Sequence, residues 1–211
     1  AIAELADRRA GAEGAAQARR EAAERLGINA DAPTLLVTGG SLGALHVNES
    51  VTAAADALPE RAQVVHLTGR GKDEPVRAAV EAAGLSDRWH VIDYLTTMED
   101  ALAVADLVVC RSGAGTVAEM EALGLPCIYV PLPIGNGEQR LNAADHVAAG
   151  GAQLVDDKDF TADFVRRNVF PLLGSTRLAD MAAASQSLGR AGAARALADL
   201  ALEQVKEACH E

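Results

Sequence analysis

A regular alternation of short apolar runs with longer amphipathic stretches begins after Pro33 and limits the folds that this chain can adopt. Short runs rich in Val, Leu and Ile are typical of strands buried on both faces of a sheet. Their alternation with helical patterns predicts βαβ units, a parallel sheet and helices over both of its faces. The expected strands cover residues 34–38, 63–68, 90–94, 106–110, 127–130 and 152–155, and the clearest expected helices cover 45–58, 74–83 and 116–123.

No repeat or low-complexity linker divides these runs, so the 211 residues are interpreted as one domain with helical ends. We predict a Rossmann-like, doubly wound α/β fold with a parallel sheet of about six strands over residues 31–160. A helical lead-in is expected over 1–30, and helices that pack on the same domain are expected over 161–211. Because the chain starts at Ala1 without an initiator methionine, we expect it to be part of a longer protein.

Charge and composition exclude several classes of function. Nineteen Lys and Arg against 30 Asp and Glu give a net charge of −11, so we expect no nucleic-acid partner. No run of about 18 apolar residues occurs, so no membrane-spanning helix is expected, and no signal-peptide pattern opens the chain. Cys110, Cys127 and Cys209 lack metal-ligand spacing, which favours a reduced cytosolic setting and buried packing of the first two.

The first candidate site is a glycine-rich turn, TGGSLGA at residues 38–44, directly after the first expected strand. Ligands of open parallel sheets bind at the carboxyl ends of the strands. Glycines allow a ligand close to the backbone, and the next helix offers unpaired N–H groups and the positive end of its dipole. With the hydroxyl of Ser41 the turn suits a phosphate, and a tight structural turn is the alternative. A dinucleotide site is the weaker interpretation, because neither G-x-G-x-x-G nor Tyr-x-x-x-Lys is present.

The second candidate is RSGAGTVAE at residues 111–119, where another strand ends in a turn of small residues that opens a helix. One account is a capping box, in which Thr116 and Glu119 satisfy each other's backbone amides. The functional account has the Glu119 carboxylate accept two ribose hydroxyls while the amides of the turn meet a diphosphate.

The third candidate is the loop that follows Pro131 and Pro133. Gln139 and Asn142 are three residues apart and share one face at the start of an expected helix. Neutral amides carry donors and acceptors together, which suits sugar hydroxyls. Ordinary capping by Asn136 and a solvated helix face is the alternative.

In this order the motifs resemble those of the MurG family, the N-acetylglucosaminyltransferases that convert lipid I to lipid II in peptidoglycan synthesis. The resemblance runs from about residue 20 to about residue 200 and includes Gly124-x-Pro126 and Val130-Pro131 besides the three segments above. It covers the C-terminal half of such an enzyme, the half that holds the sugar donor in a two-domain GT-B fold. Residues 31–160 would then be the UDP-sugar-binding domain, and 1–30 would lead in from the interdomain region.

The resemblance implies a role for each matching position. The two turns would face the donor diphosphate, and Glu119 would hold the ribose hydroxyls. Tyr94 and Leu95 would read the uracil edge through their backbone, and the two amides of the third segment would bind the GlcNAc hydroxyls. The residues implied to bind UDP-GlcNAc are Gly40, Ser41, Gly43, Ala44, Tyr94, Leu95, Met98, Arg111, Ser112, Gly113, Ala114, Gly115, Thr116, Glu119, Gln139 and Asn142.

Some positions depart from the family's usual pattern or admit two roles. Leu42 stands where Gln is usual, and Glu138 stands where a second Gln is common. Arg111 suits either a phosphate contact or a structural ion pair. The acidic run 156–159 is expected to be a solvated loop rather than a metal site. The resemblance implies no metal and no cofactor, since UDP-GlcNAc is a substrate.

The implied reaction is an inverting displacement at the anomeric carbon, with a lipid-linked muramyl hydroxyl as nucleophile. Helix N-termini aimed at the diphosphate would stabilise the charge that develops on departing UDP. No histidine matches a catalytic position, and structural or surface roles are expected for His46, His66, His90 and His146.

In the resembling family the acceptor site, the general base and the membrane-contacting patch belong to the N-terminal domain, which has no counterpart here. We therefore expect this chain to bind the donor without turnover. The full-length enzyme would meet lipid I at the inner face of the cytoplasmic membrane as a peripheral, cytoplasmic protein. It would serve cell-wall biogenesis and, through it, cell shape and cell division.

Three alternatives remain open at this stage. Another GT-B transferase, such as a glycolipid synthase that uses UDP-galactose, would differ around Glu138 and Gln139. A non-catalytic nucleotide-sugar-binding module would behave as this chain alone does. An NAD-binding domain would need an acidic residue after the second strand, where residues 68–70 read TGR. Outside these segments, Trp89 is expected to cover the core edge, and residues 191–205 are expected to form an amphipathic helix that packs toward the missing domain.

Overall fold

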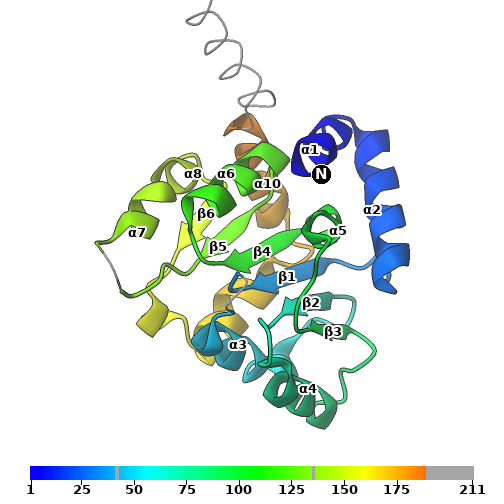
Figure 1. Ribbon diagram of the computed structural model, residues 1–211, viewed down its shortest axis with the longest axis vertical. Coiled ribbons are helices and arrows are strands. Elements are labelled where there is room, and N and C mark those ends of the chain that lie inside the picture. Colours follow the sequence, from blue (N-terminus) through cyan, green and yellow to red (C-terminus); the bar gives the residue numbers. More distant parts are fainter. Residues whose placement is uncertain (41–42, 135, 189–211) are drawn as a thin grey trace, which may run out of the picture.

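The computed structural model describes residues 1–40, 43–134 and 136–188. Within these ranges six strands form one parallel sheet in the order β3-β2-β1-β4-β5-β6 (Figure 1). The strand order reverses between β1 and β4, as in doubly wound nucleotide-binding sheets. The predicted fold class is therefore confirmed. The strands are β1 (Thr34–Thr38), β2 (Gln63–Leu67), β3 (Trp89–Ile92), β4 (Leu107–Cys110), β5 (Cys127–Tyr129) and β6 (Ala152–Leu154).

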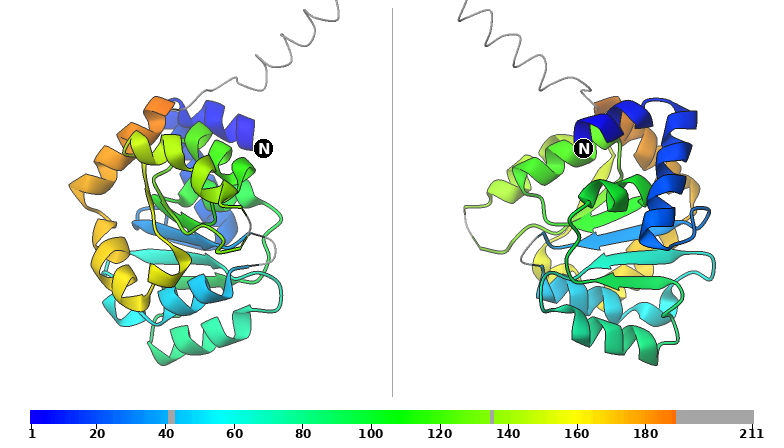
Figure 2. Two further views of the ribbon diagram at one scale, coloured as in Figure 1. Left: turned by 90° about the vertical axis from the view of Figure 1, so that its left-hand side faces the viewer. Right: turned by 45° about the vertical axis from the view of Figure 1, so that its right-hand side comes forward.

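Helices cover both faces of the sheet (Figure 2). Alternate strand residues such as Leu35 and Val37 pack with α3, α4, α9 and α10 in one core. Their neighbours, such as Leu36 and Val108, pack with α1, α2, α5 and α6 in the other. The helices are α1 (Ile2–Arg9), α2 (Ala12–Leu26), α3 (Leu45–Thr52), α4 (Asp73–Ala82), α5 (Met98–Val104), α6 (Ala114–Leu123), α7 (Glu138–Asn142), α8 (Ala144–Ala148), α9 (Ala162–Phe164) and α10 (Thr176–Leu188), with short turns η1 (Ala55–Ala57), η2 (Asp157–Asp159), η3 (Val165–Val169) and η4 (Phe170–Leu172).

The expected strands agree with the observed ones to within two residues, but two expected helices differ. The helix expected over 45–58 ends at Thr52, whose hydroxyl donates to the Asn48 carbonyl at 2.7 Å and competes with the backbone of the last turn. The helix expected from Thr116 begins two residues earlier, at Ala114, because Gly113 takes the extended N-cap conformation.

Trp89 lies inside the core rather than at its edge. Its side chain is 2% exposed, and its indole N–H donates to Nδ1 of His66 at 3.3 Å. Phe170 packs edge-on against the indole, so a segment far along the chain covers this end of β3. The periodicity of the sequence around Trp89 could not predict this contact, because Phe170 is far away in the sequence. Cys110 and Cys127 are buried free thiols, as expected.

The two ends of the chain add helices to this sheet. Gly11 lies between α1 and α2. The buried side chains of α2 are the small residues Ala18, Ala22 and Ala23, which let this helix pack closely against α5 on one face of the sheet. The helix expected over 191–205 lies outside the described residues. Among the described helices, none is long and apolar enough to cross a membrane.

Candidate functional site

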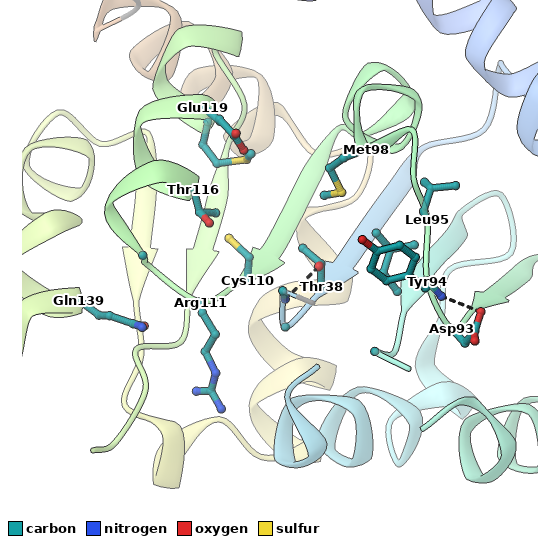
Figure 3. A pocket seen from close by; sticks show the side chains of 16 residues that line it. Thr38, Asp93, Tyr94, Leu95, Met98, Cys110, Arg111, Thr116, Glu119 and Gln139 are labelled. Atoms are coloured by element: carbon teal, nitrogen blue, oxygen red, sulfur yellow. Dashed lines mark hydrogen bonds between the residues drawn. The ribbon is translucent and has the colours of Figure 1, made fainter. Parts of the chain in front are cut away.

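A pocket of about 330 Å³ opens at the carboxyl edge of the sheet, where the strand order reverses (Figure 3). Its walls come from segments that follow β1, β2, β3 and β4, with one side chain from α7. Figure 3 shows Thr116 and Glu119 of α6 on one side and Tyr94 and Leu95 on the other. The lining residues are Thr38, Gly39, Gly40, Leu67, Gly69, Asp93, Tyr94, Leu95, Met98, Cys110, Arg111, Gly113, Thr116, Glu119, Met120 and Gln139.

The turn after β1 requires glycine at two positions. A Cβ atom on Gly39 would lie 2.1 Å from the amide nitrogen of Ala44. A Cβ on Gly43, whose φ is +67°, would lie 2.1 Å from the Thr68 carbonyl oxygen. The turn thus packs backbone against backbone beside the end of β2, and it leads into α3 with no side-chain cap at Ala44. Ser41, expected to meet the diphosphate, lies outside the described residues.

The turn after β4 does not form the capping box that was the alternative explanation of its sequence. Gly113 is the N-cap of α6 and makes no side-chain cap hydrogen bond, which puts Thr116 third in the helix and Glu119 beyond its first turn. Both side chains line the pocket instead, and neither forms a hydrogen bond with another described residue. The Ser112 side chain is fully buried, and its hydroxyl oxygen has no partner among the described atoms.

Glu119 is the acidic side chain that projects from α6 into the pocket. Burial raises the pKa of its carboxyl group, because a partly desolvated carboxylate is less favourable. A carboxylate in such a position gains from ligand hydroxyls, each of which can donate one hydrogen bond to it.

The segment between β3 and α5 forms the opposite wall. Tyr94 is 40% exposed, and the Arg70 guanidinium carbon lies 4.0 Å from the centre of its ring. The Tyr94 N–H donates to the carboxylate of Asp93 at 2.7 Å, so it is engaged within its own turn (Figure 3). Of the two amides expected to read a uracil edge, the one that stays available is therefore that of Leu95.

The amides of the third segment face different partners. Oε1 of Gln139 accepts from the Leu132 N–H at 3.0 Å, and this side chain lines the pocket. Nδ2 of Asn142 donates to the Ser112 carbonyl at 3.1 Å and lies outside the lining set. Asn136 does not cap α7, whose N-cap is Gly137 without a side-chain cap hydrogen bond. Capping by Asn136 is therefore wrong, whereas the solvated helix face of the same alternative is confirmed, because α7 has no buried residue.

Arg111 forms the structural ion pair that was one of its two expected roles. Its Nη1 donates to Asp157 at 2.5 Å and to the carbonyl oxygens of Val130 and Pro131 at 2.9 and 3.1 Å. The neighbouring Asp156 pairs with Arg140. The acidic run is thus ion-paired rather than simply solvated, because Arg111 from the turn after β4 and Arg140 from α7 reach it.

Expected residues and pocket residues overlap without coinciding. Of the expected set, Gly43, Ala44, Ser112, Ala114, Gly115 and Asn142 lie outside the lining. Conversely, Thr38, Leu67 and Cys110, each the last residue of its strand, line the pocket without having been expected there. Their position directly at the carboxyl ends of strands is the signal that would have found them.

Titratable groups elsewhere do not join this site. None of the four expected structural histidines is among the lining residues, and His66 and His146 are fully buried. Over residues 1–40, 43–134 and 136–188, no group of three or more His, Cys, Asp or Glu is placed to hold a metal ion.

The sequence matches proteins of known name over about half their length. A UDP-N-acetylglucosamine–N-acetylmuramyl-(pentapeptide) pyrophosphoryl-undecaprenol N-acetylglucosamine transferase of Bifidobacterium adolescentis is 51% identical over 168 residues, which are 74% of this chain and 43% of the relative. Its namesake from Mycolicibacterium smegmatis is 47% identical over 192 residues, 90% of this chain and 49% of the relative. The chain therefore spans about half the length of the curated relatives it matches.

The fold is similar to a solved structure of the same kind. The crystal structure of Acinetobacter baumannii MurG superposes with a TM-score of 0.73 at 27% identity, over 86% of this chain and 52% of that one. The resemblance to the MurG family inferred from the motifs is thereby confirmed. The family model "Glycosyltransferase family 28 C-terminal domain" matches residues 34–197. The chain belongs to this family.

Proposed function

We propose that this chain is the donor-binding half of an inverting N-acetylglucosaminyltransferase that binds UDP-GlcNAc and, in the full-length protein, transfers the sugar to lipid I to form lipid II. One observation carries the proposal. Segments after β1, β3, β4 and β5, each expected from its own motif to bind part of the donor, line a single pocket where the strand order reverses.

The diphosphate would lie between the turns after β1 and β4. Both turns lead into helices of at least eight residues, α3 and α6, whose first N–H groups are not capped by side chains. Because the chain carries a net charge of −11, these local donors must offset a repulsive overall field.

The nucleoside would span the pocket from Glu119 on α6 to the segment after β3. The Glu119 carboxylate would accept the two ribose hydroxyls, and the backbone of Leu95 would read the uracil edge. Tyr94 and Met98 would pack around the base. Gln139 would donate to the sugar.

In the proposed reaction the acceptor hydroxyl attacks the anomeric carbon, the bond to the diphosphate oxygen breaks, and configuration inverts. Negative charge grows on departing UDP, and the N-termini of α3 and α6 would stabilise it without a metal ion. A general base must take the hydroxyl proton. In this proposal the other half of the full-length protein supplies that base.

The proposed partners follow from that division of labour. Lipid I would bind through the other half, and the full-length enzyme would act as a cytoplasmic protein at the inner face of the cell membrane, in cell-wall synthesis. This half alone would bind the donor without turnover.

The test is a calorimetric titration of the chain with UDP-GlcNAc in EDTA, with UDP-galactose and NAD in parallel. We expect metal-free binding of one UDP-GlcNAc, weaker binding of UDP-galactose and none of NAD. Tighter binding of UDP-galactose would instead assign the chain to a glycolipid synthase. Binding of NAD, or of no ligand at all, would contradict the proposal. Product formation from lipid I by this chain alone would contradict the division between the halves.

A further inference from the structure

One peptide group in the loop after β5 is held from both sides. Nη1 of Arg111 donates to the Pro131 carbonyl oxygen at 3.1 Å. The N–H of the same peptide unit, on Leu132, donates to Oε1 of Gln139 at 3.0 Å. Because a peptide unit is planar, its C=O and N–H cannot turn independently. The orientation that Arg111 imposes on the carbonyl is therefore transmitted to Gln139.

Arg111 is well placed to impose that orientation, because its own guanidinium is anchored. The two hydrogens of Nη1 are shared among Pro131, Val130 and the carboxylate of Asp157, at distances of 2.5 to 3.1 Å. The side chains of Arg111 and Asp157 are only 15% and 16% exposed, so water competes weakly for these bonds. Figure 3 shows the guanidinium directed away from Thr116 and Glu119.

The anchored peptide also determines which group Gln139 offers to a ligand. The hydrogen bond turns its Oε1 toward the Leu132 N–H, so its –NH₂ group, with two donor hydrogens, is directed the other way. Gln139 lies on the wall between the main pocket and a second cavity lined by residues around 131–140 and 156–158. A donor at this wall suits an oxygen of the ligand's sugar.

We infer that Arg111 is a positioning residue for sugar recognition: it acts on Gln139 through the Pro131–Leu132 peptide, and it does not bind the diphosphate. The inference rests on the proposed function, because it concerns the sugar of the same donor. It replaces the phosphate contact that the motif alone suggests for Arg111.

The test compares UDP-GlcNAc with UDP, which lacks the sugar. We expect Arg111→Gln and Asp157→Asn each to raise the Kd of UDP-GlcNAc about tenfold and to change the Kd of UDP less than about twofold. Asp157→Asn is the decisive variant, because Asp157 does not line the main pocket. If Arg111 bound phosphate, removing its carboxylate partner would leave the binding of UDP-GlcNAc, like that of UDP, equal or tighter. Arg77→Gln, which breaks an exposed ion pair on α4, is the matched control.

A double-mutant cycle separates action through Gln139 from a general loss of structure. In Gln139→Ala, adding Arg111→Gln should cost little further UDP-GlcNAc affinity, since the group it positions is already gone. Thermal unfolding of each variant verifies that the protein is folded. Equal weakening of UDP and UDP-GlcNAc, or additive effects in the cycle, would overturn the inference. If the unsubstituted chain binds neither ligand, it is the proposed function that fails.

Discussion

At the amino edge of the sheet polar side chains bind one another and the backbone, whereas at the carboxyl edge two polar side chains that line the pocket have no side-chain partner. At the amino edge, the Asp106 carboxylate accepts hydrogen bonds from both terminal nitrogens of Arg19 at 3.0 Å and from the Thr34 N–H at 2.7 Å. Beside it, Nε2 of Gln63 donates to the Asn29 carbonyl at 2.6 Å and to the Thr34 hydroxyl at 2.9 Å. Every one of these groups is satisfied by another.

At the carboxyl edge the same kinds of groups stay open. The side chains of Thr116 and Glu119 line the pocket and form no hydrogen bond with the side chain of another described residue. A hydroxyl and a carboxylate at a pocket wall can bind a ligand that supplies the missing partners. The paired groups of the amino edge therefore serve the fold, and in our proposal the open side chains of the carboxyl edge serve the ligand.

The largest effect of a single substitution is expected at the amino edge. Asp106→Ala leaves the Arg19 guanidinium and the Thr34 N–H without their acceptor, so the free energy of unfolding should fall by about 3 kcal/mol. The Kd of UDP-GlcNAc should stay within about twofold of the unsubstituted value, because no ligand contact is lost. Urea unfolding and calorimetry measure the two quantities. Asp163→Ala, which breaks exposed ion pairs, is the control and should cost less than about 0.5 kcal/mol. Weakened donor binding at unchanged stability would show that Asp106 serves the ligand and not the fold.

Acidification should act on two buried histidines, His66 in β2 and His146 in α8. Burial lowers the pKa of His66 to about 3 and that of His146 to about 4, from 6.5. Nδ1 of His66 accepts the indole N–H of Trp89, a bond that protonation of this nitrogen would break, and Nδ1 of His146 lies 2.9 Å from the Tyr129 hydroxyl. The unfolded state therefore binds more protons below pH 6.5, and stability that is fully present above pH 6.5 is lost as the pH falls toward 4.

From pH 7 to pH 5 this linkage should lower the free energy of unfolding by about 2 kcal/mol for each of the two rings, about 4 kcal/mol together. Urea unfolding at pH 7, 6 and 5 measures it. His146→Gln should show a shallower pH dependence than the unsubstituted chain. A stability that does not change over this range would contradict the neutral, buried state of both rings.

Glu119→Ala is the corresponding test of the carboxyl edge. The Kd of UDP-GlcNAc should rise at least about tenfold, roughly 1.4 kcal/mol, because the ribose hydroxyls lose their acceptor. The free energy of unfolding should change by less than about 0.5 kcal/mol, since Glu119 supports no other described side chain. Calorimetric titration and urea unfolding measure the pair, with Glu81→Ala on α4 as the control. A large loss of stability would show that Glu119 serves the fold instead.

The smallest effect is expected for Arg70→Gln. The Arg70 guanidinium lies 4.0 Å from the centre of the Tyr94 ring at an exposed position, where such cation–π contacts contribute little. Donor affinity should fall about twofold as Tyr94 becomes less ordered. A competitive titration with UDP-GlcNAc, carried out on Arg70→Gln and on the control Arg77→Gln, resolves a twofold difference in Kd. A tenfold loss would mean that Arg70 itself contacts the ligand.

The carboxyl edge was largely predictable from the sequence, because its motifs are contiguous. The runs that form β1 and β4 each lead directly into a turn of small residues. Glu119 follows the end of β4, and Gln139 follows the end of β5, within about ten positions along the sequence. The parallel sheet then brings these separate turns together. Local patterns are therefore sufficient to predict which segments meet at this edge.

The amino edge was not predictable, because its contacts join residues far apart in the sequence. Arg19 and Asp106 are separated by 87 positions, and neither stands in a recognisable motif. For the same reason the sequence left two roles open for Arg111, whose partner Asp157 is 46 positions away. The start of α6 was misjudged because the conformation of Gly113, and not the position of Thr116, decides where the helix begins.

A crystal structure of this chain with UDP-GlcNAc would show directly whether the donor binds at the carboxyl edge. We expect the diphosphate at the N-termini of α3 and α6 and both ribose hydroxyls within about 2.5–3.0 Å of the Glu119 carboxylate oxygens. We also expect the –NH₂ group of Gln139 at a sugar oxygen and Arg111 still bound to Asp157. A nucleotide bound elsewhere, or bound in this pocket with Glu119 turned away from its ribose, would contradict the account.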